Sequence, residues 1–229
     1  MTKLFTSINE CRRSPQGECT FHKKTEINRV ILLLIGIELF FVSIFALAGP
    51  FVSVFIAQGI SGGAISIVGI ASMIFLITKS TLQIPFSHLV DKTAKENSIV
   101  GILSLGYATM ALCPLILAFS TATWHVFVAQ FFCGLGNALS YPSWNALFTH
   151  HIDQKQAAFE WSIYDTIIGL SSAGAVALGG FLIDKTSFQA VFLVTGFIIL
   201  LSSFLPLVFY KRFGNSHTHS WKNKNSALN

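Results

Sequence analysis

Six long apolar segments run through this chain, and each is long enough to cross a lipid bilayer as an α-helix. A spanning helix needs about 20 consecutive, mostly apolar residues. Charged residues make up only 11% of the 229 residues, against about 25% in an average soluble domain. We therefore predict an all-α membrane protein with six transmembrane helices. The expected spans cover residues 30–56, 65–90, 99–118, 124–148, 159–183 and 190–210, the first bent near Gly49–Pro50.

The connections between these segments are short, so residues 30–210 are predicted to form one transmembrane domain. Polar tails flank this domain at residues 1–29 and 211–229. The first tail does not read as a cleavable signal, because it is polar and the apolar run after it is too long for the core of a signal sequence. The tail is therefore expected to precede the first span directly.

The 15 Lys and Arg residues are distributed unevenly around the six segments. With the N-terminus placed inside, thirteen of them lie in inner segments, Lys185 is outside, and Lys79 lies within the second span. Lys and Arg are enriched in the cytoplasmic loops of membrane proteins. We therefore expect a multi-pass protein of the cell membrane with both termini in the cytoplasm. Basic ends on an apolar body favour contact with a membrane surface over binding of nucleic acid.

Two nearly identical charged turns follow apolar segments, LVDKT at residues 89–93 and LIDKT at residues 182–186. Their aspartates are 93 residues apart, and Pro50 and Pro142, each late in a span, are 92 residues apart. This offset corresponds to three spans. Because three is odd, the two copies lie on opposite sides of the membrane. The chain is therefore predicted to consist of two inverted three-helix repeats.

The turn after the second span resembles the signature Gly-x-x-x-Asp-Arg/Lys-x-Gly-Arg/Lys-Arg/Lys of the major facilitator transporters. Asp91, Lys92 and Lys95 occupy its acidic position and two of its basic positions, while both glycines and the last basic residue differ. The fourth span, QFFCGLGNALSYPSW, is similar to the family's fourth span, with Gln130 where an Arg usually precedes Gly-x-Gly. The fifth span, GLSSAGAVALGGFLID, resembles the glycine-rich fifth span of the family. Residues 28–212 thus resemble one half of a major facilitator fold.

This resemblance implies a secondary transporter that moves a small solute or ion by alternating access. Members of the family have twelve spans, arranged as two halves of the same orientation. A six-span chain is therefore expected to be a half-length form, which pairs as a parallel homodimer or with a separately encoded second half. The expected partners are a small-molecule or ion substrate, the lipid bilayer and this second six-span unit.

Two opposite charges within the spans are candidates for the substrate or ion pathway. Glu38 and Lys79 lie at similar depths in the first and second spans, on the order of 12–16 Å from the inner face at 1.5 Å per residue. A charge inside a bilayer is costly unless it is paired. We predict a Glu38–Lys79 ion pair facing the bundle interior. It could serve the cavity or act as a static strut, and a third reading has Lys79 extending to the inner surface.

Four further residues are assigned to the same pathway. Gln130 and Asn137 lie seven residues apart in the fourth span and so share one face, where they either line a cavity or bond neighbouring helices. Trp161 and Asp165 share a face of the fifth span near its cytoplasmic end. Asp165 either contacts basic residues of an inner loop or serves as a proton or substrate group at the cavity mouth.

Two groups are expected to support conformational change. The cytoplasmic turn with Asp91, Lys92 and Lys95 is predicted to latch onto neighbouring helix ends in one access state, and the alternative is a solvated basic loop that orients the protein. In the fifth span, small residues recur every four positions, which lets helix backbones approach closely or slide. These helix-packing residues are Gly169, Ala173 and Ala177.

Other functions lack the residues they need. A rhomboid-like protease requires a Gly-x-Ser-x-Gly motif, which the sequence lacks, so no enzymatic activity is expected. A channel would require a re-entrant loop, and a mitochondrial-type carrier would require three repeats. Neither feature is visible. Cys11, Cys19 and His22 are too few and too spread for a zinc site, so free thiols and no cofactor are expected. The remaining alternative is a non-transporting membrane scaffold, which would rarely keep charges within its spans.

Overall fold

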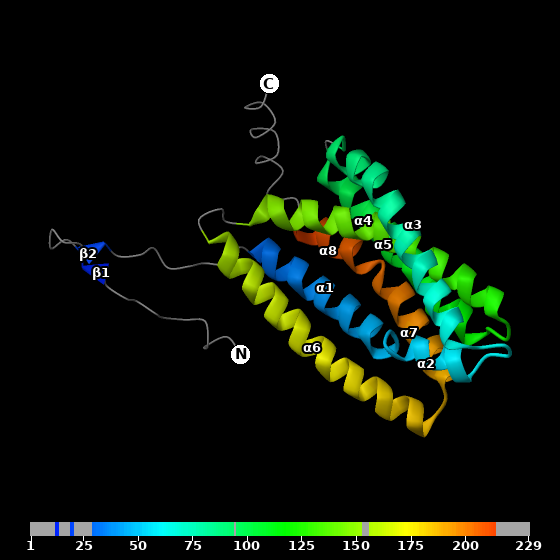
Figure 1. The fold of residues 1–229 in the computed structure, drawn as a ribbon. Coiled ribbons are helices and arrows are strands. Elements are labelled where there is room, and N and C mark those ends of the chain that lie inside the picture. The colour runs from blue at the N-terminus through cyan, green and yellow to red at the C-terminus, as the bar shows by residue number, and fades with distance from the viewer. Residues whose placement is uncertain (1–11, 14–18, 21–28, 94, 153–155, 214–229) are drawn as a thin grey trace.

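The computed structural model describes residues 12–13, 19–20, 29–93, 95–152 and 156–213, and nearly all of them are helical (Figure 1). The predictions for Cys11, His22 and the last 16 residues of the C-terminal tail lie outside this part of the chain. A two-residue ladder pairs β1 (Arg12–Arg13) with β2 (Cys19–Thr20). The helices are α1 (Arg29–Ala48), α2 (Phe51–Gln58), α3 (Ile65–Asp91), α4 (Glu96–Ala118), α5 (Thr123–His151), α6 (Ala157–Lys185), α7 (Phe188–Ser202) and α8 (Leu205–Phe213).

These helices correspond to the six predicted spans. The predicted bend at Gly49–Pro50 is confirmed, because it separates α1 from α2 within the first span. The sixth segment is also interrupted, between α7 and α8. Among the described residues, five segments are both long and apolar enough to cross a membrane. The sixth helix, α5, has 29 residues and is therefore long enough, but its polar side chains lower its hydropathy.

The packing order of the helices confirms the inverted repeat. Helix α5 packs between α3 and α4, α4 packs on α7, and α1 packs on both α7 and α6. The resulting order is α3–α5–α4–α7–α1–α6. The repeat exchanges the first span with α5, α3 with α6, and α4 with α7. This exchange reverses the order and leaves every neighbour relation intact, as an inverted pair of three-helix units requires.

Glycines allow α5 to approach both of its neighbours. Gly134 and Gly136 are two positions apart, which places them on nearly opposite faces of the helix. A Cβ atom on Gly134 would lie 2.7 Å from the carbonyl oxygen of Phe75 in α3. A Cβ atom on Gly136 would lie 2.6 Å from the backbone nitrogen of Met110 in α4. The Gly-x-Gly of the fourth span therefore permits close packing on two sides.

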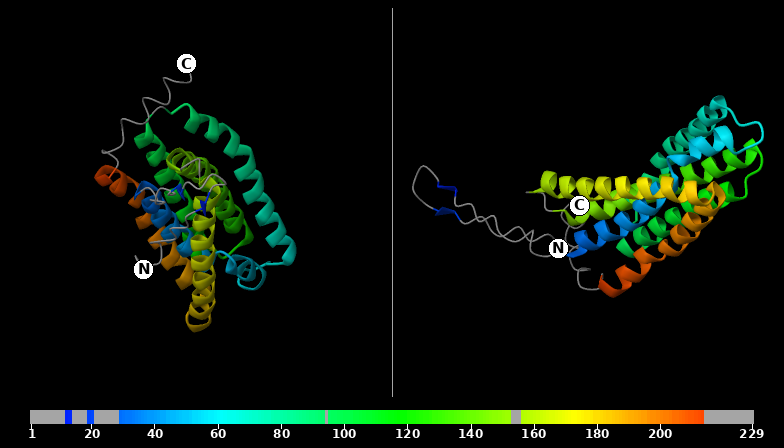
Figure 2. Two further views of the ribbon diagram at one scale, coloured as in Figure 1. Left: turned by 90° about the vertical axis from the view of Figure 1, so that its left-hand side faces the viewer. Right: turned by 90° about the horizontal axis from the view of Figure 1, so that it is seen from below.

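Helices α3 and α6 lie at opposite margins of the bundle, as Figure 1 and the left view of Figure 2 show. In the most apolar stretch of α4, 56% of the residues are buried, whereas the values are 6% for α3 and 11% for α6. The interior therefore centres on α4. Helices α3 and α6, which the repeat exchanges with each other, are the least buried.

A buried polar cluster ties helices together at the end of the bundle where α3 and α5 end, which we name the basic end. Nε2 of His151 in α5 lies 3.3 Å from Oε1 of Glu96 in α4, and both side chains are buried. Nδ1 of the same ring lies 2.9 Å from the carbonyl oxygen of Leu147. The hydroxyl of Tyr210 in α8 also contacts Glu96. Three elements therefore meet at one carboxylate.

Candidate functional site

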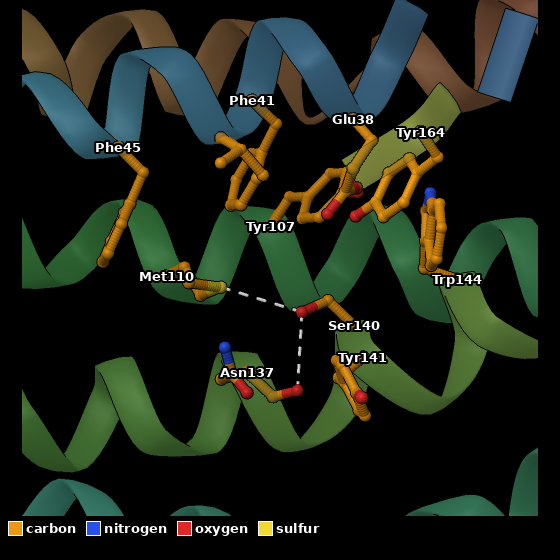
Figure 3. Close-up of a pocket in the computed structure, with 11 residues that line it drawn as sticks. Glu38, Phe41, Phe45, Tyr107, Met110, Asn137, Ser140, Tyr141, Trp144 and Tyr164 are labelled. Carbon is orange, nitrogen blue, oxygen red and sulfur yellow. Dashed lines mark hydrogen bonds between the residues drawn. The ribbon is translucent and has the colours of Figure 1, made fainter. Parts of the chain in front are cut away.

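A cavity of about 190 Å³ lies among the helices and is bounded by α1, α4, α5 and α6 (Figure 3). We name it the Glu38 cavity. Its wall is mostly aromatic, with a few polar groups. The lining residues are Glu38, Phe41, Val42 and Phe45 from α1, Tyr107 and Met110 from α4, Asn137, Ser140, Tyr141 and Trp144 from α5, and Tyr164 from α6.

The acidic group of this cavity is held by a phenol. The Tyr107 hydroxyl donates a hydrogen bond to Oε2 of Glu38. The ring of Tyr107 stacks on Phe41, with centroids 3.8 Å apart, and is itself buried. Figure 3 shows the hydroxyl of Tyr164 turned toward the same carboxyl group. Because its surroundings are otherwise apolar, the Glu38 carboxyl group can be stabilised only by these hydroxyl groups or by a solute in the cavity.

Two buried polar atoms at the cavity have no partner among the described residues. They are Oδ1 of Asn137 and Nε1 of Trp144. Ser140, between them in the chain, is better satisfied, with its hydroxyl 3.5 Å from the Asn137 carbonyl oxygen and 3.7 Å from Sδ of Met110. Buried polar groups in proteins are nearly always hydrogen-bonded. An unpaired acceptor and an unpaired donor beside a carboxylate are thus suited to a ligand.

The predicted Glu38–Lys79 ion pair is wrong for this structure. Glu38 contacts Tyr107, and Nζ of Lys79 lies 5.4 Å from the centre of the Tyr141 ring. The prediction assumed that consecutive helices are neighbours. Instead, α1 packs on α6 and α7, whereas α3 packs on α5. Equal depth therefore did not bring the two charges together.

The other predicted pathway residues separate into two groups. Asn137 lines the Glu38 cavity, whereas Gln130, seven residues earlier on α5, is half-buried outside it. Trp161 packs in an aromatic cluster, with its ring centroid 4.7 Å from that of Phe148. Asp165 is exposed on α6, and no hydrogen bond or ion pair joins it to the rest of the described chain.

The predicted gating turn borders a second cavity. This cavity, of about 380 Å³, lies between α3 and α5 and includes Gln83, Asp91 and Asn145 in its lining. We name it the Asp91 cavity. Tyr141 lines both cavities, so the two adjoin across a single side chain. Lys92 and Lys95 are exposed beside Asp91 at the basic end.

The predicted packing stripe faces away from the neighbouring helices. Gly169, Ala173 and Ala177 are exposed, and a Cβ atom on Gly169 would meet nothing within 4 Å. Helix α6 instead approaches α1 through Gly179, whose Cβ atom would lie 1.9 Å from the carbonyl oxygen of Leu47. The four-residue spacing identified a stripe of small residues but not the side of α6 on which α1 lies.

Sequence reasoning missed several cavity residues, among them Tyr107, Ser140, Trp144 and Tyr164. The depth of Tyr107 along its helix would have indicated this residue. Tyr107 is 11 residues into α4 and Glu38 is 9 residues into α1, so both lie about 14–17 Å from the same end of the bundle. A phenol at the level of a buried carboxylate is a natural hydrogen-bond donor. Trp144 and Ser140 carried no comparable signal.

Comparison with known proteins agrees with this architecture. The sequence profile of the Major Facilitator Superfamily matches residues 28–228. The multidrug resistance protein MdtG of Dickeya zeae (strain Ech586) is 25% identical over 157 residues, which cover 68% of this chain and 36% of that protein. The match therefore spans little more than a third of the relative's length. No solved structure matches this chain. Because the profile covers most of the sequence, the chain belongs to the Major Facilitator Superfamily.

Proposed function

We propose that this chain moves a small solute across the cell membrane by alternating access, and that the solute binds in the Glu38 cavity. Membership of a family of secondary transporters provides the general activity and argues against an enzyme. The specific observation that carries the proposal is the chemistry of the cavity. A buried carboxylate, an unpaired acceptor and an unpaired donor converge there inside an aromatic wall.

The cavity favours an aromatic or amphiphilic cation. A carboxylate buried among apolar groups is costly in its charged form unless a cation or hydrogen-bond donors compensate it. Tyr107 supplies one donor, and a bound cation would supply the charge. The faces of Phe41, Tyr107 and Trp144 attract cations and stack on flat rings. The name of the relative, a multidrug resistance protein, is in line with such a solute.

Alternating access requires a second unit to complete the pathway. In transporters of this class, substrate sites lie near the bilayer midplane, and one repeat or bundle rocks against another. The described helices supply one such bundle. The second is a parallel copy of this chain or another six-span half. The Asp91 cavity, which adjoins the Glu38 cavity at Tyr141, is a route for the solute toward the basic end.

The orientation belongs to the same proposal. Thirteen of the 15 Lys and Arg residues lie on the side assigned to the cytoplasm, so the basic end faces inward. Labelling of single cysteines introduced at Thr93 and Ser187 tests this assignment. We expect position 93 to react from the cytoplasmic side and position 187 from the outside. Cytoplasmic labelling at position 187 would reverse the orientation.

Binding of a defined probe tests the site. The protein, purified in mild detergent, is titrated with radiolabelled methylphenylpyridinium, a flat aromatic cation, and with neutral methylbiphenyl for comparison. We expect saturable binding of the cation only. The change Glu38→Gln should weaken it by about 2–5 kcal/mol, because a buried charge partner is lost. The same proteins, reconstituted in vesicles, should show probe uptake in the native form and none in Glu38→Gln.

The matched control is Asp184→Asn, which removes a carboxylate that is exposed at the far end of α6 and outside both cavities. It should bind and transport the probe like the native protein. Equal binding of the cation by the native protein and Glu38→Gln would reject the Glu38 cavity as the site. Binding without any uptake by the native chain would instead favour a non-transporting role.

A further inference from the structure

Two charged side chains within the membrane region have no oppositely charged partner among the described residues. Lys79 on α3 contacts only the face of the Tyr141 ring, and no hydrogen bond or ion pair involves Asp165 on α6 among the described residues. Charged groups within a bilayer are rare and are usually paired or facing water. Glu38 meets this requirement through Tyr107, so the two margin helices hold the charges that remain to be matched.

Each of these charges adjoins a residue that lines the Glu38 cavity. Lys79 lies over Tyr141, which forms the α5 side of the Glu38 cavity. Asp165 directly follows Tyr164, which forms its α6 side. Helices α3 and α6 lie at opposite margins of the bundle (Figure 2). A single partner that covers this face would therefore meet a positive charge on one flank and a negative charge on the other.

The heights of the two charges are compatible. Helix α3 ends and α6 begins at the basic end. Lys79 is 12 residues from the end of α3, which corresponds to about 18 Å. Asp165 is 8 residues from the start of α6, which corresponds to about 12 Å. The difference of about 6 Å along the membrane normal is within the reach of the flexible four-carbon side chain of lysine.

We propose that a second copy of this chain covers the Glu38 cavity, and that Lys79 of each copy pairs with Asp165 of the other. A half turn about an axis along the membrane normal keeps both copies in the same orientation. It also brings α3 of one copy opposite α6 of the other. In such a two-fold interface every contact occurs twice, so both charges of both copies are neutralised. The charge pattern is self-complementary, and this favours a second copy over an unrelated partner.

The inference deepens the proposed function, because it names the second unit that alternating access requires. The inference rests on the proposed function, but the association of two chains can be measured without measuring transport. The exposed apolar side chains of α3 and α6, such as Met73 and Leu170, do not carry it, because lipid would cover them equally well. The paired charges discriminate between lipid and a protein partner.

The test uses two variants that should fail alone and succeed together. Lys79→Asp places two acidic groups at each contact between identical chains, and Asp165→Lys places two basic groups there. A mixed pair of these variants restores one Lys–Asp contact on each flank. Differently tagged chains are co-expressed, and association is measured by co-purification and by energy transfer in vesicles. We expect each variant to self-associate about tenfold or more weakly than the native chain, and the mixed pair to associate like the native chain.

Matched controls apply the same charge changes at the outer end of α6. Lys185→Asp and Asp184→Lys should leave self-association unchanged, because both residues lie at the end of the helix far from the proposed contacts. A variant that does not insert is replaced by a crosslinking pair. Chains with Lys79→Cys and chains with Asp165→Cys should be joined by a short thiol crosslinker far more efficiently than two chains with the same change.

Two results would overturn the inference. One is a native chain that stays monomeric in vesicles. The other is self-association of both charge variants at the native level. A monomeric chain that still binds methylphenylpyridinium in a Glu38-dependent way would reject the dimer and leave the proposed solute site standing. The two failures are therefore distinguishable.

Discussion

The helix pair α4–α5 and the margin helices α3 and α6 differ in what surrounds them. At α4–α5, glycine contacts bring two backbones together, and only a minority of the residues are exposed. At the margins, most residues are exposed, and Lys79 and Asp165 have no oppositely charged partner among the described residues. Polar groups of the interior face a cavity, whereas at the margins Asp165 is exposed and Lys79 lies over the Tyr141 ring.

This difference fits the two tasks that we propose. The interior helices carry Tyr107 and Asn137, and Glu38 on α1 lines the same cavity. The margin helices carry the two charges that we propose pair with a second copy. The inverted repeat explains why the margins occur as a pair, since it exchanges α3 with α6 and so leaves both equally uncovered.

The largest effect is expected from filling the α4–α5 contact. In Gly136→Leu, even the Cβ atom would lie 2.6 Å from the Met110 backbone nitrogen and 2.7 Å from the Gly106 carbonyl oxygen. Overpacking of this kind costs about 1–3 kcal/mol or more, and backbone atoms cannot move aside. We expect little folded protein, measured by monodisperse yield and thermal unfolding. Gly169→Leu on α6 is the matched control and should fold normally, because a Cβ atom there meets nothing within 4 Å. Equal yields for the two variants would contradict the comparison.

A smaller loss of stability is expected at the basic end. Glu96→Gln replaces the carboxylate that His151 and Tyr210 contact with a neutral amide, which keeps an acceptor but removes its charge. Exchanging hydrogen bonds to a charged group for bonds to a neutral group costs about 1 kcal/mol. The thermal midpoint should fall, with probe binding retained in the folded fraction. Lys95→Gln, which neutralises the exposed neighbouring residue, should change the midpoint little. An unchanged midpoint in Glu96→Gln would show that this cluster does not stabilise the bundle.

Removing the Tyr107 hydroxyl at the Glu38 cavity should lower stability by a comparable or smaller amount. Tyr107→Phe removes the hydroxyl that donates to the Glu38 carboxylate, at a cost of about 1–3 kcal/mol. We expect lower thermal stability and a stronger stabilisation by bound methylphenylpyridinium, because the cation then supplies a larger share of the compensation. Tyr141→Phe is the control, since no described hydrogen bond involves its hydroxyl. Identical ligand stabilisation in the native protein and Tyr107→Phe would argue against a cation beside Glu38.

The smallest structural effect is expected at the gating turn. Asp91 is exposed and borders the cavity between α3 and α5, so Asp91→Lys should fold with nearly native stability. Uptake of the probe into vesicles should nevertheless fall, because the proposed latch acts only when the access state changes. The corresponding change at the second charged turn, Asp184→Lys, should leave uptake closer to native. Native uptake in Asp91→Lys would reduce the turn to an orienting loop.

The spans, the bend at Gly49–Pro50 and the inverted repeat were predictable because each depends on local composition or on sequence offset. The partners of the charges were not. Equal depth suggested Glu38 and Lys79, but the repeat places α1 and α3 on opposite sides of α4 and α5. The spacing of Gly169, Ala173 and Ala177 likewise defined a stripe without defining its neighbour. Which helices adjoin depends on the packing of the whole bundle, and no single segment contains that information.

The most direct test of the central claim, that a solute occupies the interior cavity beside Glu38, is the fluorescence of Trp144. In a variant with Trp124, Trp161 and Trp221 all changed to Phe, this cavity-lining residue is the sole tryptophan. Methylphenylpyridinium should quench its emission with the same concentration dependence as radioligand binding, and Glu38→Gln should abolish both. Saturable binding of the probe with unchanged Trp144 emission would place the solute elsewhere and contradict the account.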